Sequence, residues 1–262
     1  MLRLYLCEVI CDSFTKGVSV RRKKHHPCDV SVAWTVKLAI DDQTTGLVAS
    51  RLKEALGSSK LVVCLGSRLE LASFCNVEAI CAHVVGGATT TAEAKELLNE
   101  TFADFLITDD VPEAGSGVAL AKEFRHLKTL VLTSRENSEL VKEAEEAGVD
   151  GLVFRSGIGL CGEGSFLQAI LTVARGGVWL SPAVSCIVNS GADKDALATI
   201  SELTDKEQAV LTQVARGLDN NEIATELFIS EETCKSHLRA IHQKVGVTDR
   251  VKLALLAIKA GI

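Results

Sequence analysis

The sequence predicts an α/β fold, a doubly wound parallel sheet of five strands, followed by a small all-helical domain. Three observations lead to this prediction. The chain has 262 residues, of which 47% are apolar, so two domains can each have a core of their own. Short apolar runs alternate with amphipathic stretches from residue 61 to residue 175. Residues 203–260, in contrast, show helical periodicity and no strand signal.

The sheet is predicted from five short apolar runs. Between them lie amphipathic stretches, most of which begin with Ser, Thr or Asn at a plausible helix cap. Parallel strands need connections of helix length, so this alternation indicates a parallel sheet with helices on both faces. The predicted strands are 61–65, 81–85, 104–108, 129–132 and 151–154, and the predicted helices are 67–76, 90–101, 117–126, 137–147 and 165–175.

Composition divides the rest of the chain. The first 40 residues carry 7 Lys and Arg against 3 Asp and Glu, a basic bias typical of a solvated, disordered segment. A second interpretation is that translation starts further down and that this segment is not made. Glycines, Pro182 and a polar run indicate a linker after the sheet. The predicted organisation is a disordered or untranslated basic extension (1–40), an amphipathic helix (41–58), the sheet domain (59–176), the linker (177–202) and the helical domain (203–262).

Hydropathy and cysteine usage exclude several classes of protein. No apolar run approaches the roughly 18 residues needed to cross a bilayer, and the N-terminal 40 residues lack the pattern of a secretion signal. We therefore expect a cytoplasmic protein with no membrane partner. The nine cysteines are scattered, several inside apolar runs, which favours reduced thiols over disulfides. Cys7, Cys11, His26 and Cys28 are not spaced like a zinc site, so no metal ligands are assigned.

The helical domain contains clear helix start and stop signals. Candidate caps stand at Thr204 with Glu207, at Ser230, and at Thr248 or Asp249. Gly217 and Gly246 stand where helices 205–216 and 231–245 should end. These signals predict four short helices and a helix-turn-helix motif over residues 220–245.

The third of these helices has two distinct faces. Its apolar stripe is formed by Cys234, Leu238, Ile241 and Val245, at spacings of four, three and four. Its opposite face presents Lys235, Ser236, Arg239, His242 and Gln243. A cationic, hydrogen-bonding face is what a helix in a DNA major groove requires. The alternative is a solvated amphipathic helix, because charged outer faces are common.

Charge distribution limits how such a helix would bind DNA. The net charge of the chain is −6, residues 41–202 carry 13 Lys and Arg against 23 Asp and Glu, and residues 203–262 carry 8 against 8. DNA affinity must therefore depend on where individual cations lie, and we expect it to be modest for a monomer and steeply dependent on salt.

Residues 203–260 resemble the LuxR/NarL-type C-terminal DNA-binding domain through "LTDKEQAVL", "GLDNNEIATEL", "ISEETCKSHLRAIHQKVGV" and "DR". The resemblance implies that Lys235, Ser236 and Arg239 face the bases, that Thr233, His237 and Lys244 lie toward the DNA backbone, and that the last helix, Arg250–Ala260, mediates dimerisation. Asn221 departs from the Lys or Arg usual in the family, so a phosphate contact there becomes a neutral hydrogen bond.

Residues 61–175 resemble the receiver domain of bacterial response regulators, which has a flavodoxin-like fold. "ADFLITDDVPEAGSGVALAKEFR" and "TLVLTSRENSELVKEAEEAGVDGLVFRS" carry the resemblance. It implies that Asp109 is the phosphoacceptor, that Gly117 opens the next helix and that Thr133 is the switch hydroxyl. Arg155 stands where the family has lysine.

The predicted receiver site lacks several carboxylates. Phosphoryl transfer to a carboxylate needs a divalent cation, and Mg²⁺ requires several oxygen ligands. The family supplies an acidic pair after the first strand, where this chain has "LGSR", so only Asp109 and Asp110 remain. No cofactor is therefore predicted, and any Mg²⁺ binding should be weak. We predict a degenerate or weakly phosphorylated receiver. The alternatives are a conventional switch at Asp109 and a plain strand-end carboxylate that pairs with Arg155.

Taken with these resemblances, the sequence predicts a DNA-binding transcriptional regulator of the two-component response-regulator class. Its expected partners are double-stranded promoter DNA, a second copy of the chain, and a sensor histidine kinase if Asp109 works as a switch. An enzyme is disfavoured, because the chain has no P-loop, nucleophile elbow or HExxH motif. A third hypothesis is a non-DNA-binding interaction module.

Overall fold

A six-stranded parallel sheet forms the larger domain in the computed structural model, which describes residues 50–157, 165–188, 194–247 and 249–262. The strand order is β2-β1-β3-β4-β5-β6, and every neighbouring pair is parallel. The strands are β1 Leu61–Cys64, β2 Val84–Ala88, β3 Phe105–Asp109, β4 Lys128–Thr133, β5 Gly151–Phe154 and β6 Trp179–Leu180. The strand order reverses at β1, as expected for a doubly wound sheet.

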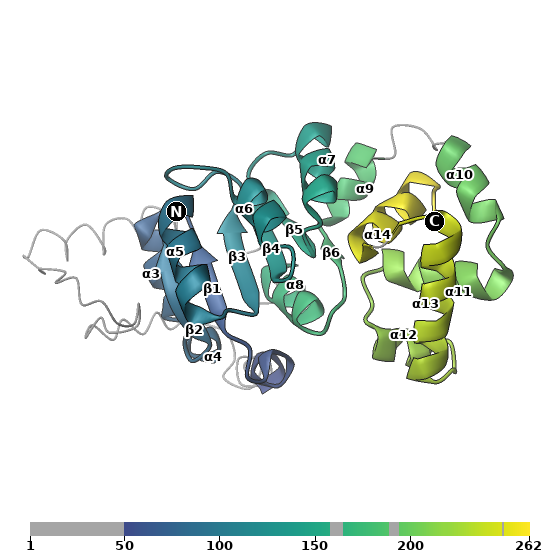
Figure 1. Ribbon diagram of the computed structural model, residues 1–262, viewed down its shortest axis with the longest axis horizontal. Helices are drawn as coiled ribbons and strands as arrows, with labels where there is room; N and C mark the ends of the chain where they lie inside the picture. Colours follow the sequence, from purple (N-terminus) through teal and green to yellow (C-terminus); the bar gives the residue numbers. More distant parts are fainter. Residues whose placement is uncertain (1–49, 158–164, 189–193, 248) are drawn as a thin grey trace, which may run out of the picture.

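Helices cover both faces of this sheet (Figure 1). They are α3 Arg68–Cys75, the short α4 Glu78–Cys81, α5 Thr91–Thr101, α6 Gly117–Glu123, α7 Ser138–Ala147 and α8 Ser165–Ala174. A further helix covers residues 50–56. Alternate strand residues enter different cores, so Leu61 and Val63 pack with α8 whereas Val62 packs with α5. None of the helices in the described ranges is sufficiently long and apolar to span a bilayer.

The structure corrects three expectations from the sequence. The sheet has six strands instead of five, because Trp179 adds a short edge strand whose amide donates to the Asp150 carbonyl at 3.0 Å. The predicted linker 177–202 therefore contains β6, α9 Pro182–Val188 and α10 Lys194–Ser201. The strand predicted at 81–85 begins instead at Val84, after α4. Short apolar runs do not distinguish a helix from a strand by periodicity, which explains this last error. The predicted extension 1–40 lies outside the described residues.

The C-terminal domain consists of α11 Asp205–Ala215, α12 Asn220–Glu226, α13 Glu231–Val245 and α14 Arg250–Lys259. The Thr204–Glu207 capping box is present, and the side chains of Ser230 and Asp249 cap α13 and α14. Gly246 ends α13 in the left-handed region, with φ of 75°. The helix ends predicted from the sequence are therefore confirmed here.

The two domains share a core through α14, which lies between α11 on one side and α7 and α9 on the other (Figure 1). Six of its side chains are almost fully buried: Val251, Leu253, Ala254, Leu255, Ala257 and Ile258. At its end, Lys259 Nζ donates to Glu145 Oε2 of α7 at 2.9 Å. Close backbone packing adds to this interface, because a Cβ on Gly177 would lie 2.4 Å from the Gly217 carbonyl oxygen. The last helix is thus covered by the sheet domain.

Candidate functional site

The third helix of the C-terminal domain, α13, presents the polar face expected from its sequence. Cys234 and Ile241 are fully buried and Leu238 is nearly so, which fixes the opposite side of the helix outward. Arg239 is the most accessible cation on that side, with 66% of its side chain exposed, and the Lys235 side chain is 40% exposed. The outward face of α13 that carries Lys235, Ser236 and Arg239 is therefore accessible to solvent.

Acidic residues in the first turn of α13 hold both of these cations. Lys235 Nζ lies 2.7 Å from Glu231 Oε1, one turn earlier, and this bond raises the pKa of Lys235 above its usual value. Arg239 Nη1 lies 3.6 Å from Glu232 Oε1, so its long side chain extends toward the N-terminal end of the helix. The charges of Lys235 and Arg239 are thus partly neutralised within their own helix.

The side chains expected near the DNA backbone lie around α13 in different environments. Thr233 is exposed at the helix start, where its hydroxyl lies 2.8 Å from Ser230 Oγ. Ser236 is exposed and His237 half-buried. Lys244 Nζ instead donates to Glu207 Oε2 at 2.7 Å, which ties the end of α13 to α11.

Glu207 was assigned from the sequence only to a helix cap, yet it also anchors Lys244. Its side chain is 7% exposed, and its carboxylate accepts from the Thr204 backbone amide at 2.8 Å. The Lys244 bond and the capping contacts hold the pKa of Glu207 at about 2. The capping pattern fixed the position of this acid, but no signal in the sequence indicated its distant partner.

His242 also differs from expectation. The sequence pattern placed it on the outward face, but its Nδ1 lies 2.6 Å from the Val247 carbonyl oxygen. The ring therefore contacts the backbone just after the end of α13.

Asn221 lies at the start of α12, on the edge of a cleft between the domains. The cleft has a volume of about 560 Å³ and is lined by residues of helix 50–56, of the end of α8 and of the first turns of α12 and α13. Arg175 spans it by pairing with Glu222 at 3.5 Å, and Glu54 adds a carboxylate from the sheet domain. Asn221 is exposed, and its backbone N–H donates to Asp219 Oδ1 at 2.8 Å.

Asp109, at the carboxyl end of β3, is held by neighbours on two strands. Its Oδ1 accepts from Arg155 Nη2 just after β5, and its Oδ2 accepts from the Gly66 amide just after β1, at 2.7 Å. Only 8% of its side chain is exposed. Burial raises the pKa of Asp109 above its usual value, and the Gly66 and Arg155 contacts oppose this effect.

Glu70 completes this group and was not found from the sequence. Its Oε2 lies 3.0 Å from Arg155 Nη1, so one guanidinium bridges two carboxylates. Glu70 follows the N-cap Ser67 in the first turn of α3, a signal that predicts a helix start. Its contact with Arg155 joins residues 85 positions apart, which no local pattern indicates.

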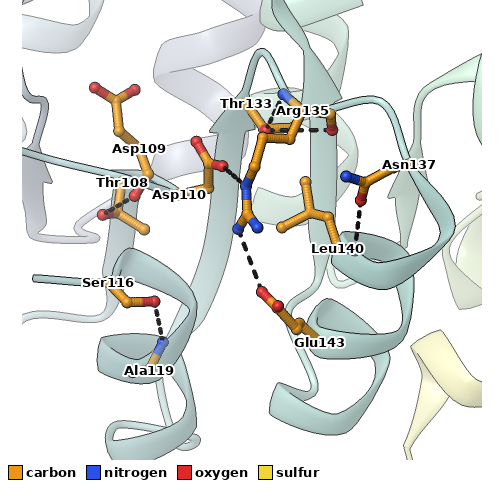
Figure 2. A network of polar contacts seen from close by, with 10 residues as sticks. All are labelled: Thr108, Asp109, Asp110, Ser116, Ala119, Thr133, Arg135, Asn137, Leu140 and Glu143. Atoms are coloured by element: carbon orange, nitrogen blue, oxygen red, sulfur yellow. Dashed lines mark hydrogen bonds and ion pairs between the residues drawn. The ribbon is translucent and has the colours of Figure 1, made fainter.

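Asp110 does not share the position of Asp109, although the two are adjacent in sequence. Figure 2 shows its carboxylate directed toward Arg135, whose Nε donates to Asp110 Oδ2 at 2.7 Å. Arg135 also reaches Glu143 on α7 at 3.3 Å, and the Thr133 hydroxyl accepts from the Arg135 amide at 2.8 Å. The sheet edge therefore carries two separate acid–arginine–acid groups.

Glycine at position 117 allows β3 and α6 to approach closely. A Cβ there would lie 1.9 Å from the Asp109 carbonyl oxygen, so a larger residue would displace the loop that follows Asp109.

The donor set around Asp109 does not fit Mg²⁺, the ion that the resemblance to receiver domains implies for phosphoryl transfer. The carboxylates of Asp109 and Glu70 are already bridged by the Arg155 guanidinium. The described residues contain no group of three or more His, Cys, Asp or Glu side chains able to hold a metal. Mg²⁺ prefers several oxygen ligands in octahedral geometry, which this arrangement does not offer.

Comparisons with known proteins cover both domains. Residues 201–257 match the family model for bacterial regulatory proteins of the luxR family. The uncharacterized transcriptional regulatory protein YhcZ of Bacillus subtilis is 34% identical over 185 residues, which are 68% of this chain and 84% of that protein. The nitrate/nitrite response regulator protein NarP of Escherichia coli is 31% identical over 183 residues, 67% of this chain and 82% of NarP.

Among solved structures, a complex of the two-component response regulator RcsB with DNA matches 76% of this chain and 98% of its own, at 22% identity and a TM-score of 0.44. The sequence relatives are transcriptional regulators and not enzymes, and the matched segments extend beyond the C-terminal domain. The chain therefore belongs to the LuxR/NarL family of DNA-binding transcriptional response regulators.

Proposed function

We propose that the protein binds promoter DNA through α13 and regulates transcription as a homodimer. The observation that carries this proposal is the exposed face of α13, where Lys235, Ser236 and Arg239 project away from a buried stripe. Arg239 can donate two parallel hydrogen bonds to a guanine edge, and Lys235 can reach a base or a phosphate. Thr233 and the amides at the helix start suit a phosphate oxygen, and exposed Asn221 offers a neutral hydrogen bond to another.

Gel shifts on the cognate promoter test this assignment. The double variant Lys235→Ala/Arg239→Ala should bind at least about 30-fold more weakly, because two base contacts are each worth roughly 1–3 kcal/mol. A matched control is Lys206→Ala/Arg216→Ala, which removes two exposed cations from α11 and its C-cap and should change affinity much less. Unchanged binding by the first variant would remove α13 from the DNA interface, and no promoter binding by the wild type would favour the interaction-module hypothesis.

We further propose that residues 59–176 act as a receiver without efficient metal-dependent phosphorylation. Supporting this, Arg155 and the Gly66 amide already occupy both oxygens of Asp109. A phosphoryl donor would have to displace a buried ion pair before Asp109 could attack. Asp110 and Thr133, the expected supporting residues, are engaged with Arg135 instead.

Intact-mass measurement after incubation with acetyl phosphate and Mg²⁺ tests the receiver proposal. We expect no stoichiometric gain of a phosphoryl group, with Asp109→Asn as the control that cannot accept one. A full gain that the control lacks would establish the conventional switch and would make a sensor histidine kinase the expected partner.

The docked position of α14 bears on dimerisation. Its apolar side chains are covered by the sheet domain and by α11, so the same face is not available to a second copy in this arrangement. We propose that α14 leaves the sheet domain when the homodimer forms on DNA. Sedimentation of the full chain should show a monomer without DNA and two copies bound to each site with promoter DNA. A dimer in the absence of DNA would contradict this order of events.

A further inference from the structure

Two acids in the first turn of α13 lie beside the cations that should meet DNA, and one of them, Glu231, also lines the cleft between the domains. Glu231 and Glu232 follow the N-cap Ser230 directly. Acids at this position stabilise a helix through its dipole, but they also repel phosphate. Both are paired with the cations that face the bases, Lys235 at 2.7 Å and Arg239 at 3.6 Å.

These ion pairs are accessible enough to exchange. The side chains of Glu232 and Arg239 are 72% and 66% exposed, and those of Glu231 and Lys235 are 49% and 40% exposed. Exposed pairs of this kind contribute little to stability and are screened by salt. DNA can therefore displace the carboxylates from the two cations, but it then leaves both acids next to the duplex without their partners.

The fate of these acids should differ between correct and incorrect DNA. On a non-operator sequence the cations contact phosphates, and the carboxylates remain unpaired in a strongly negative environment. In the major groove, a carboxylate can accept a hydrogen bond from the exocyclic amino group of cytosine. A site that offers such a donor beside the guanine bound by Arg239 therefore offsets the repulsion, and other sequences do not.

We propose that Glu231 and Glu232 are specificity-determining residues, which penalise non-operator DNA and favour sites with an amino donor next to the guanine contact. This inference rests on the proposed function of α13 as the recognition helix. On this account, the two acids that lower the positive charge of α13 do more than weaken its affinity for DNA. They also help the protein to discriminate between DNA sequences.

The experiment uses the full chain and DNA selected by the wild type from a random-sequence duplex pool. Affinity is measured for the selected duplex and for a scrambled duplex of the same composition. The variants are Glu231→Gln, Glu232→Gln and the double substitution, which remove charge while keeping size. Glu226→Gln at the end of α12 is the matched control, because Glu226 is exposed and makes no ion pair within the described residues.

Each Gln variant should bind scrambled DNA about 3- to 10-fold more tightly and the selected duplex with a smaller gain, so that the ratio of the two affinities falls. The control should leave this ratio within about twofold of the wild type. Glu232→Asp, which keeps the charge, should retain most of the penalty on scrambled DNA. Circular dichroism checks that α13 remains folded in every variant.

Equal gains on both duplexes would reduce the two acids to general electrostatic repulsion and would overturn the inference, as would no gain at all. In either case the wild type would still prefer its selected site, so the proposed function would stand. If the wild type selects no sequence from the pool, the proposed function itself fails.

Discussion

Two ion pairs in this protein join an arginine to a carboxylate in opposite surroundings. In the sheet domain, Arg155 pairs with Asp109, and their side chains are 29% and 8% exposed. On α13, Arg239 pairs with Glu232, and the corresponding fractions are 66% and 72%. The first pair joins the end of β3 to the residue just after β5, whereas the second lies within one helix.

This difference in solvent exposure determines which of the two ion pairs can break at low cost in free energy. Removing one partner of a buried pair leaves an uncompensated charge and costs about 3–5 kcal/mol, whereas an exposed pair contributes roughly 0–1 kcal/mol. The Asp109 carboxylate is therefore held in place, which opposes its use as a phosphoacceptor. The Arg239 guanidinium can exchange its partner, as the proposed contact with DNA requires.

The largest expected effect comes from breaking the buried pair. Arg155→Ala should lower the free energy of unfolding by about 3 kcal/mol at neutral pH, measured by urea denaturation. Loss of the arginine raises the pKa of buried Asp109 further, so the folded variant holds a proton that the unfolded chain releases, and its stability falls as pH rises. The deficit should thus be smaller at pH 5 than at pH 8. Arg155→Lys keeps the charge and should lose less; a deficit below about 0.5 kcal/mol for the Ala variant would contradict the buried-pair account.

An intermediate effect is expected at Glu207, which is buried but pairs with a partly exposed lysine. Glu207→Gln should destabilise the C-terminal domain by about 2 kcal/mol, because it weakens both the capping box and the Lys244 bond. The pKa of Glu207 is about 2 against an ordinary 4.5, so the unfolded state binds more protons between these values.

The stabilising contribution of Glu207 is therefore complete above pH 4.5 and is lost as pH falls toward 2. Thermal unfolding of the wild type and the variant between those values should show the difference shrinking as pH falls. A difference independent of pH would show that the charge of Glu207 does not matter.

The interdomain pair of Lys259 with Glu145 should have a smaller effect. These side chains are 30% and 22% exposed, and the pair lies at the end of an apolar interface. Lys259→Glu should weaken docking by about 1 kcal/mol and increase the radius of gyration in small-angle X-ray scattering. The swap Lys259→Glu/Glu145→Lys should restore the docked dimensions, and its failure to do so would assign the effect to packing instead of charge.

The smallest effect on stability is expected for the exposed pair of Arg239 with Glu232. Glu232→Gln should change the free energy of unfolding by less than about 0.5 kcal/mol, although we expect it to alter DNA discrimination. Urea denaturation of Glu232→Gln and Arg155→Ala under the same conditions would compare the two losses of stability directly. A loss comparable to that of Arg155→Ala would mean that exposure does not separate the two pairs.

Much of the fold was predictable because its signals are local. The apolar stripe of α13, its cap at Ser230 and its end at Gly246 depend on residues within a few turns, and the structure has all three. The pairing of Lys235 with Glu231 also follows from helical spacing. The sixth strand escaped prediction, because Trp179 and Leu180 form a strand only against the edge provided by β5.

By itself, then, the sequence determined the two domain classes, the outward face of α13 and the position of Asp109 at a strand end, because periodicity and caps act over short distances. Only the tertiary structure decided that Glu70 joins Asp109 through Arg155, that Asp110 turns to Arg135, and that α14 is covered by the sheet domain. These contacts join residues far apart in the chain, and their geometry exists only once the sheet has brought its strands together and the domains have packed.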